Sequence, residues 1–320
     1  NTGKYDLDVI IPCYNVEKYV RLCIDSIMNM DYKCNVRIII IDDGSEDATG
    51  NIIDEYAGRK NILIIHQENQ GLSGARNAGL LEVNADYVMF LDSDDYIVDG
   101  NLDAILEFAY SENVDIIEGK MVTLSGNVID YAKDNSFEFV EINRHKATGY
   151  ACGKIFKTTL FDNVSFPAGY WFEDGIIRYL IMPRCEKIYG FNGLIYAYRQ
   201  NEEGISYKSR GNIKSIDAYW LREIIFDDMK KLGIEITQEL YEMLIDEIAL
   251  TFVRTSGLEQ NVKISIFYLT AEWFRPLHKR FRSRNRFHYV LEKGLELENF
   301  QTYADGCGLL WNSRIVQVDV

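Results

Sequence analysis

The sequence is poor in proline, in basic residues and in long hydrophobic runs, and each shortage removes a class of protein. With 4 prolines in 320 residues, it is not a proline-rich or collagen-like chain. Its apolar runs, such as Ile38–Ile41, fall far short of the ~20 residues that cross a bilayer. The polar opening segment, Asn1–Asp8, does not resemble a signal peptide. The net charge of -15 disfavours nucleic acid as a partner.

Closely spaced cysteines are also missing. The sequence has no CxxC pair among its six cysteines, which are Cys13, Cys23, Cys34, Cys152, Cys185 and Cys307. Because a disulfide framework or a zinc site needs tighter grouping, we expect reduced, buried cysteines in a cytoplasmic protein. The histidines show no paired metal-ligand spacing, which predicts structural or surface roles for His66, His145, His278 and His288.

What the sequence does contain is a hydrophobic share of 47% and an alternation of β-branched with helical segments. Its length predicts about two domains. The expected buried strands are Leu7–Ile11, Val36–Ile41, Asn61–Ile65 and Tyr87–Leu91. The expected helices carry an apolar stripe from Val16 to Ile27, begin at a capping Ser45, follow Ser73 to Leu81, and cover Leu102–Ser111. This alternation predicts an α/β fold with a mostly parallel, Rossmann-like sheet.

After Ser111 the pattern is less regular. A further strand is expected at Asp115–Ile117. The Asn192-Gly193 pair predicts the turn of a hairpin between Lys187–Phe191 and Leu194–Arg199.

The polar stretch Gln200–Asn212 is the best candidate for a domain boundary. The sequence beyond it is helical in character, for example over Ala218–Leu232 and Thr237–Val253. We therefore expect an α/β domain over residues 1–205 and a mainly helical C-terminal extension over residues 206–320.

Polar groups follow three of the predicted strands. They are the segments Pro12–Asn15, Asp42–Ser45 and Asp92–Asp95. In an open parallel sheet, ligands bind outside the carboxyl ends of the strands, so these distant segments should converge on one crevice.

The Asp92–Asp95 segment places several carboxylates within one turn. Hard oxygen donors suit Mg²⁺ or Mn²⁺, and a cation would relieve the repulsion between the carboxylates. The alternative is a solvated acidic turn that introduces the helix at Leu102. Because two other polar strand ends are expected in the same crevice, we favour the metal site over the solvated turn.

Five motifs occur in order over about the first 200 residues: VIIPCYN at Val9–Asn15, IDDGS at Ile41–Ser45, NQGLSGARN at Asn69–Asn77, FLDSDD at Phe90–Asp95 and FED at Phe172–Asp174. Together they resemble the family 2 glycosyltransferases, which are inverting enzymes that use nucleotide-diphosphate sugars. The resemblance implies the GT-A nucleotide-diphospho-sugar transferase fold. Tyr198 and Arg199, followed by Ile205 and Ser206, resemble the family's closing segment.

The resemblance also implies a nucleotide and metal site. Pro12 and Tyr14 would shape the nucleotide pocket, and Asp43 would accept a hydrogen bond from uracil. Asp94, with help from Asp92, would hold Mn²⁺ or Mg²⁺ on the diphosphate. Two further residues are placed in the substrate site, namely Ser93 and, on the nucleotide side, Arg76.

For the acceptor side, the resemblance implies that Asp174 is the general base. Glu173 lies beside it in the substrate site, and Trp171 could stack on an acceptor sugar. Each assignment has a structural alternative. Arg76 could form only an ion pair with a strand-end carboxylate, Glu173 could be an ordinary acid at a helix start, and Asp42 and Asp43 could cap the helix after Ser45.

The implied reaction is a metal-dependent, inverting transfer of a sugar from a UDP-sugar to a hydroxyl of a glycan or lipid-linked glycan. We expect it in cell-surface polysaccharide synthesis at the cytoplasmic face of the membrane. One alternative is a catalytically silent nucleotide-sugar-binding or scaffold protein, against which the intact Asp92, Asp94 and Asp174 argue. Another is a sugar nucleotidyltransferase. That class would have a glycine-rich basic loop after its first strand, whereas this sequence has Pro12–Asn15 there.

The C-terminal part contains a local reversal of charge. Residues Arg275–Arg286 include six Lys or Arg and no acid, whereas the rest of the chain has 28 basic against 49 acidic residues. Aromatic residues accompany this run, so 264–288 could be a helix lying on an anionic membrane surface. The equal alternatives are a basic face whose aromatics pack on the core and a surface for self-association into a homo-oligomer.

Overall fold

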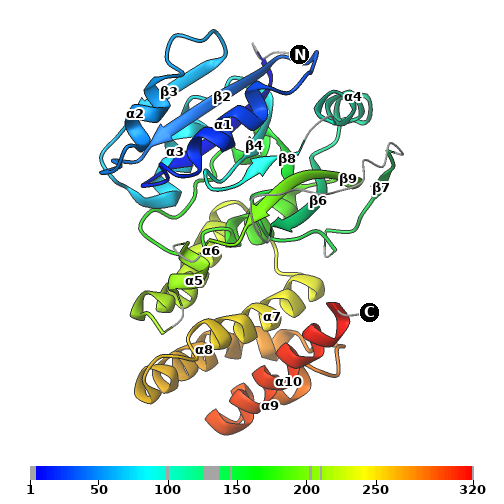
Figure 1. The fold of residues 1–320 in the computed structure, drawn as a ribbon. Coiled ribbons are helices and arrows are strands. Elements are labelled where there is room, and N and C mark those ends of the chain that lie inside the picture. Colours follow the sequence, from blue (N-terminus) through cyan, green and yellow to red (C-terminus); the bar gives the residue numbers. More distant parts are fainter. Residues whose placement is uncertain are drawn as a thin grey trace. The chain divides into compact units, whose positions relative to one another are not determined.

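The computed structural model describes residues 5–98, 101–124, 137–144, 146–201, 204–209 and 211–318. His145 lies outside these residues. The chain forms two compact units, Asn1–Asn201 and Glu202–Val320. The first unit contains the sheet and the second is helical, as Figure 1 shows. The predicted α/β fold with a mostly parallel sheet and a mainly helical C-terminal part is confirmed.

The first unit is built on one mixed sheet with the order β3-β2-β1-β4-β8-β6-β9-β5, to which β7 adds beside β9 (Figure 1). Its strands are β1 Tyr5–Cys13, β2 Val36–Asp42, β3 Ile62–His66, β4 Ala85–Phe90, β5 Tyr96–Ile97, β6 Ile116–Leu124, β7 Phe139–Glu141, β8 Lys154–Lys157 and β9 Ile188–Arg199. The first four strands pair in parallel, and β8 then pairs antiparallel with both β4 and β6. All the strands expected in the first hundred residues are present.

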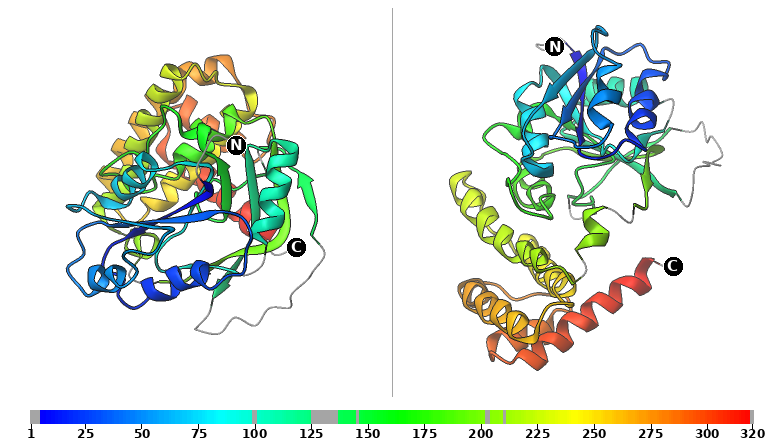
Figure 2. Two further views of the ribbon diagram at one scale, coloured as in Figure 1. Left: turned by 90° about the horizontal axis from the view of Figure 1, so that it is seen from above. Right: turned by 60° about the vertical axis from the view of Figure 1, so that its left-hand side comes forward.

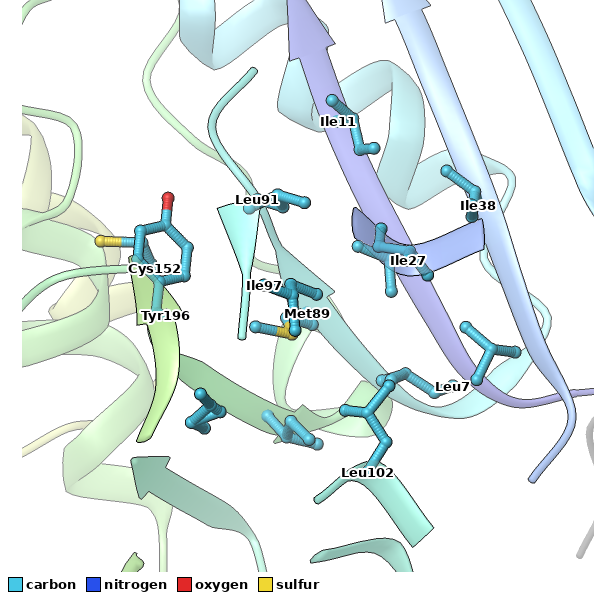
Figure 3. Close-up of a cluster of buried hydrophobic side chains, with 14 of the residues drawn as sticks. Leu7, Ile11, Ile27, Ile38, Met89, Leu91, Ile97, Leu102, Cys152 and Tyr196 are labelled. Carbon is cyan, nitrogen blue, oxygen red and sulfur yellow. The ribbon is translucent and has the colours of Figure 1, made fainter. Parts of the chain in front are cut away.

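Helices connect the parallel strands, as the alternating pattern requires. They are α1 Val20–Met28, α2 Thr49–Asp54, α3 Gly71–Leu81 and α4 Leu102–Glu112. Their apolar side chains and those of the sheet form one core, part of which Figure 3 shows with Leu7 and Ile11 of β1, Ile38 of β2 and Ile27 of α1. Because this core surrounds β1, the carboxyl end of β1 is held in a fixed position between its neighbours.

The predicted hairpin at Asn192-Gly193 is wrong. Residues 188–199 form the single strand β9, which pairs in parallel with β6, and Asn192, Gly193 and Ile195 are the extra residues of a bulge. The bulge lies opposite Gly119, where an added Cβ would meet Ile195 at 1.9 Å. The Asn-Gly pair therefore serves a bulge that re-aims the strand instead of reversing it.

Two predicted helix starts are also misplaced. Ser45 does not cap α2, which begins at Thr49 without a side-chain cap, because the Ser45 hydroxyl accepts a hydrogen bond from the backbone of Asn15. Similarly, α3 begins at Gly71 and not after Ser73. At Ser45 the chain uses a polar side chain for a contact between loops, which a pattern of local preferences does not contain.

The cysteines follow the prediction. All six are free, and all are buried except Cys34, which is partly buried. They therefore pack as small apolar side chains in the cores of the two units.

The second unit consists of helices. Their bounds are α5 Ile205–Lys208, α6 Asp217–Lys231, α7 Gln238–Arg254, α8 Gln260–Arg280, α9 Tyr289–Glu296 and α10 Phe300–Val318 (Figure 2). Residues from α7 to α10 share a core of their own. No helix in the described part of the chain is long and apolar enough to cross a membrane.

The aromatic side chains of 264–288 belong mainly to this core. Phe267 and Phe274 are buried in it, and Phe281 packs against it, whereas Tyr268 is exposed. The packed-aromatic alternative is therefore what the structure shows, and the prediction that the aromatics of this segment face a membrane is wrong for these buried side chains. They are in the core because a helical unit of this size needs their apolar area.

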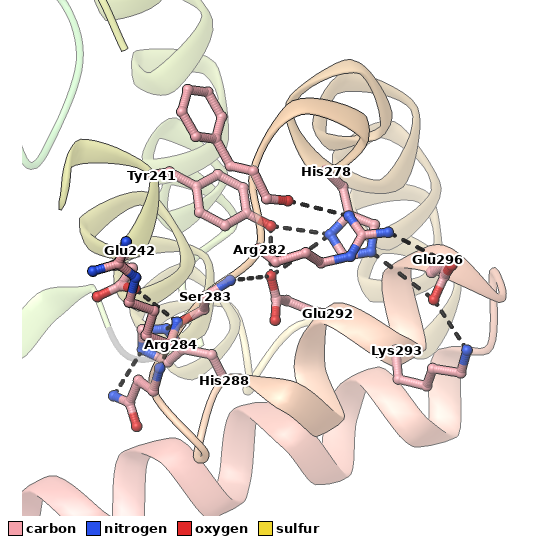
Figure 4. Close-up of polar contacts among 12 residues, drawn as sticks. Tyr241, Glu242, His278, Arg282, Ser283, Arg284, His288, Glu292, Lys293 and Glu296 are labelled. Carbon is pink, nitrogen blue, oxygen red and sulfur yellow. Dashed lines mark hydrogen bonds and ion pairs between the residues drawn. The ribbon is translucent and has the colours of Figure 1, made fainter. Parts of the chain in front are cut away.

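The loop between α8 and α9 is held by a polar network, shown in Figure 4. The Tyr241 hydroxyl donates to Glu292 at 2.5 Å and lies 3.0 Å from His278 Nδ1. His288 lies 2.7 Å from the Ser283 hydroxyl and 3.0 Å from Asp246. His278 and His288 are thus structural, as predicted. Because His278 pairs with Glu292 and His288 with Asp246, acidic side chains lie close to the basic segment.

Candidate active site

The carboxyl ends of β2, β1 and β4 lie next to one another in the sheet. Cys13, the last residue of β1, pairs with Asp42 of β2, and the Asp43 amide donates to the Cys13 carbonyl at 2.8 Å. On the other side, the Leu91 amide donates to the Ile10 carbonyl at 3.0 Å. The three polar strand ends therefore meet at one edge of the sheet, as expected for parallel strands.

Hydrogen bonds join the loop after β1 to the loop after β2. The Asn15 amide donates to the Ser45 hydroxyl at 3.1 Å, and the Asn15 side chain accepts from the Glu46 amide at 2.8 Å. Asn15 adopts a φ of 51°, which few residues other than asparagine and glycine tolerate. Next to it, Pro12 is buried and Tyr14 is 47% exposed. The ring of Tyr14 is thus accessible at this edge, whereas Pro12 is not.

Asp43 is the predicted uracil acceptor, and its side chain is 2% exposed. Its Oδ1 accepts from the Gln67 side chain at 2.7 Å and from the Gln70 amide at 2.8 Å. Gly44 follows with a φ of +73°, and a Cβ there would lie 3.0 Å from the Asn69 amide nitrogen. The neighbouring backbone therefore holds the Asp43 carboxylate in one orientation. Its role toward uracil stays a prediction.

Asp42 and His66 form a separate contact at the end of β2. His66 Nδ1 lies 2.9 Å from Asp42 Oδ2, and the Ser45 amide donates to Asp42 Oδ1 at 3.1 Å. Hydrogen bonding to Asp42 raises the pKa of His66. Asp42 thus organises its own turn, which agrees with the structural role preferred for it.

The acidic turn Asp92–Asp95 follows β4 and is bound by the end of β9. The Tyr196 hydroxyl donates to Asp95 Oδ2 at 2.7 Å and accepts from the Asp92 amide at 3.2 Å. The Arg199 amide donates to Asp95 Oδ1 at 2.6 Å, and the Asn201 side chain donates to Asp94 Oδ2 at 2.8 Å. Each of these contacts spans about a hundred residues of sequence.

The carboxyl groups of this turn are crowded and partly removed from water. Burial, together with the charges of Asp92 and Asp94, raises the pKa of Asp95 to about 8. Burial also raises the pKa of Asp94. Such a turn favours a bound positive charge.

Arg76, on α3, supplies positive charge at one end of the turn. Its guanidinium is 2% exposed and donates to Asp92 at 2.9 Å, to Glu173 at 2.7 Å and to Asp174 at 3.1 Å. It also lies over the ring of Phe166, 5.2 Å from its centre. The ion pair with a strand-end carboxylate, the alternative role for Arg76, is thus present. It brings the predicted metal ligand and the predicted base to one guanidinium.

Glu173 and Asp174 stand at the start of a short helix whose regular part is Ile177–Ile181. The preceding residue, Phe172, has a φ of 68°, which costs a bulky residue about 1–3 kcal/mol. Burial raises the pKa of both carboxyl groups, and the Arg76 guanidinium opposes the rise. Glu173 is 5% exposed, whereas the Asp174 side chain is 31% exposed. Asp174 is therefore the acid of the pair that a substrate can reach.

The family comparison agrees with this arrangement. Residues 8–174, more than half of the chain, match the family model of glycosyl transferase family 2. The chain belongs to this family. The match to the family model confirms the resemblance drawn from the five motifs.

Two relatives with assigned names cover most of the chain. Glycosyltransferase GlyA of Streptococcus pneumoniae is 29% identical over 88% of this family 2 chain and 43% of its own length. The poly(ribitol-phosphate) β-N-acetylglucosaminyltransferase TarS of Staphylococcus aureus is 27% identical over 80% of the chain and 46% of its own length. The chain thus spans less than half the length of these two relatives.

A solved structure shows the same fold. The crystal structure of S. aureus TarS 1-349 in complex with UDP-GlcNAc superposes with a TM-score of 0.78 at 19% identity, covering 96% of the family 2 chain and 92% of the TarS chain. This likeness confirms the predicted GT-A fold.

The remaining predicted site residues lie at the same sheet edge or on the segment of the acidic pair. Ser93 is buried beside the Cys13 thiol, and Trp171 is partly buried with its ring edge-to-face to Phe172. Sequence analysis missed Tyr196, Asn201 and Lys154. Tyr196 and Asn201 lacked a signal, because nothing in the sequence of β9 and the residues after it indicates that they contact the acidic turn. Lys154 opens β8 directly before the apolar Ile155-Phe156 pair, and its buried ammonium group lies 3.3 Å from Glu118.

Among the described residues, no three His, Cys, Asp or Glu side chains form a group that could hold a metal ion by themselves. Asp94 and Asp92 of the family 2 chain nonetheless offer oxygen ligands, which Mg²⁺ and Mn²⁺ prefer, and burial leaves their turn short of compensating charge. The donor set therefore fits a cation that takes its other ligands from phosphate and water.

Proposed function

We propose that the chain is a metal-dependent, inverting glycosyltransferase that moves a sugar from a UDP-sugar to a hydroxyl group. The observation that supports this most is the position of Arg76, whose guanidinium lies within 3.1 Å of both Asp92 and Asp174. A diphosphate site and a proton acceptor are thereby brought close together, as a single displacement requires. A catalytically silent binding protein would not need Asp174 at this place.

In this mechanism Asp174 accepts the proton of the attacking hydroxyl. Burial, which raises the pKa of the carboxyl group, makes it a stronger base than an exposed aspartate. Arg76 holds the carboxylate in place and opposes that rise. One displacement with the base on the face opposite the leaving group inverts the anomeric carbon.

A divalent cation, Mn²⁺ or Mg²⁺, would be held by Asp94 with help from Asp92 and would neutralise charge on the departing diphosphate. Asp43 would accept a hydrogen bond from uracil, with Pro12 and Tyr14 beside it. This assignment to UDP is supported by the likeness to TarS, whose crystal structure was determined in complex with UDP-GlcNAc.

The acceptor we propose is a hydroxyl group on a cell-surface polymer. TarS is named for poly(ribitol-phosphate), a polyol phosphate chain that offers many hydroxyl groups. The Trp171 ring, beside the acidic pair, would stack on an acceptor sugar ring where the polymer carries one.

Two substitutions test the proposal. Asp174→Asn should leave UDP binding unchanged and lower transfer by about 10²–10⁴-fold, the usual contribution of a general base. Asp162→Asn, at an exposed aspartate, is the matched control. The assay measures UDP release from a panel of UDP-sugars. Near-native turnover of Asp174→Asn would move the base elsewhere.

Asp94→Ala should abolish the Mn²⁺-dependent part of UDP binding in calorimetry, because it removes the proposed ligand. Asp31→Ala, at an exposed aspartate, should bind UDP and Mn²⁺ like the wild type. Unchanged affinity of Asp94→Ala would contradict the metal role, and absence of UDP binding by the wild type would contradict the donor class.

A further inference from the structure

The acidic turn Asp92–Asp95 is held by hydrogen bonds from the end of β9 and from the residues that follow it. Tyr196 is fully buried, lies in the same core cluster as Leu91 and Cys152, and connects the two ends of the turn (Figure 3). Its hydroxyl accepts from the amide of Asp92 at 3.2 Å and donates to the side chain of Asp95 at 2.7 Å. A single buried group thus sets the separation of the first and last residues of the turn.

The carboxylates of the turn differ in what holds them. Asp92 has a charged partner, the guanidinium of Arg76. Asp95 receives a hydrogen bond on each oxygen, from Tyr196 and from the Arg199 amide. The side chain of Asp94 receives a hydrogen bond from the neutral amide of Asn201 at 2.8 Å, and Arg199 Nε donates to the Asp94 backbone carbonyl at 2.9 Å. A neutral donor fixes the orientation of a carboxylate without neutralising its charge.

We infer that Tyr196 and Asn201 are positioning residues for the cation that Asp94 binds. This inference rests on the proposed function. Like charges within one turn repel one another, so that the turn has to be held if Asp94 is to point at one place. Tyr196 holds the backbone of the turn, and Asn201 holds the side chain of Asp94.

The same contacts explain the bulge in β9. Three residues of β9 have no partner in β6, namely Asn192, Gly193 and Ile195, so that Leu194 lies opposite Lys120 and Tyr196 opposite Met121. Because side chains alternate between the faces of a sheet, such a shift decides on which face Tyr196 points. An unbulged strand of the same length would present a different residue to the acidic turn.

The test is a titration of Mn²⁺ followed by electron paramagnetic resonance, with and without UDP, on the whole chain. Asn201→Ala should weaken Mn²⁺ binding in the presence of UDP about tenfold, which is the size of one hydrogen bond to a charged group. Tyr196→Phe should weaken it several-fold. UDP binding without metal should stay within twofold for both, which separates positioning from general damage to the fold.

A matched control lies on the same strand. Tyr189→Phe removes a hydroxyl from a ring that packs on Phe108. This variant should bind Mn²⁺ like the wild type.

If Asn201→Ala and Tyr196→Phe also bind Mn²⁺ like the wild type, the inference is wrong while the proposed metal site stands. If the wild type binds UDP but no Mn²⁺, both the metal role of Asp94 and the inference are wrong. Should Tyr196→Phe fail to fold, Asn201→Ala decides alone, because Asn201 is only partly buried.

Discussion

Replacing Arg76 by methionine is the most informative single change. The guanidinium is 2% exposed and pairs with Asp92, Glu173 and Asp174 at 2.9, 2.7 and 3.1 Å. Methionine keeps much of the apolar stem against Phe166 and removes the charge. Breaking a buried ion pair by deleting one partner costs about 3–5 kcal/mol. Because the side chains of Asp92 and Asp174 are 29% and 31% exposed, we expect the lower end of this range.

The loss of stability should depend on pH, and its sign follows from the proton balance. Without the guanidinium, the largest effect that opposes burial is lost, and the pKa values of Glu173 and Asp174 rise further. The folded variant then holds protons that the unfolded chain releases above its carboxyl pKa of about 4. Its unfolding free energy therefore falls as the pH rises through this window. The difference between wild type and Arg76→Met should be larger at pH 8 than at pH 5.

Urea unfolding measures this difference. A loss of ~3 kcal/mol with a slope of ~2–3 kcal/mol/M lowers the midpoint by about 1 M at pH 8. Because the chain has two units, the probe should report on the first unit alone. Trp171 is the one tryptophan before residue 202, so its fluorine-labelled NMR signal provides such a probe.

Arg21→Met is the matched control. Arg21 pairs with Glu55 at 2.7 Å, but the two side chains are 49% and 55% exposed, and such solvent-screened pairs contribute little to stability. If Arg76→Met shifts the midpoint no more than Arg21→Met, or shifts it more at pH 5 than at pH 8, the reasoning about the buried cluster is wrong.

Three further changes have definite expected results. Gly44→Ala should lower the unfolding free energy by about 1–3 kcal/mol and weaken UDP binding, measured by urea unfolding and calorimetry, because it adds strain at a φ of +73° and a contact with Asn69. Lys154→Met should move the acidic limb of the kcat/KM profile to higher pH, because a buried cation that lowers the pKa of Asp174 is removed. Phe274→Ala should destabilise the helical unit by about 3–5 kcal/mol in urea without changing sedimentation with anionic vesicles.

Each of these changes has a control in the chain. Gly58 has a similar φ of +78°, and a Cβ there would meet no atom within 4 Å. Gly58→Ala therefore isolates the effect of the contact at Gly44. Lys157→Met removes a lysine whose ammonium group binds Asn113 at the surface and should leave the pH profile unchanged. Tyr268→Ala changes an aromatic that is 51% exposed and should leave stability almost unchanged. Loss of salt-sensitive vesicle binding in Phe274→Ala, while the unit is still folded, would contradict the packed-aromatic arrangement.

The parallel half of the sheet was predictable because its signal is local and repeated. Segments such as Val36–Ile41 are apolar on both faces, which only a buried parallel strand requires, and the helices between them show one apolar stripe. The strand ends converge as a consequence of this topology. The positions of Asp43 and of the acidic turn at one sheet edge could therefore be foreseen.

The element boundaries were less predictable because side chains were diverted to other loops. Ser45 has every local property of a helix cap, yet its hydroxyl accepts from the backbone of Asn15, thirty residues away. The Asn192-Gly193 pair has the composition of a hairpin turn but forms a bulge, since β9 gains more from pairing with β6. In both cases a contact distant in sequence outweighs a local preference.

The amino-acid order alone specifies the fold class, the family and the chemical types at the site, because each is encoded in short motifs and in the period of apolar residues. The cluster that Arg76 forms and the dependence of the acidic turn on Tyr196 and Asn201 are decided by the folded chain only. Residues about a hundred positions apart become partners only after the sheet has set their distance. Burial then changes their pKa values by an amount that no pattern along the sequence contains.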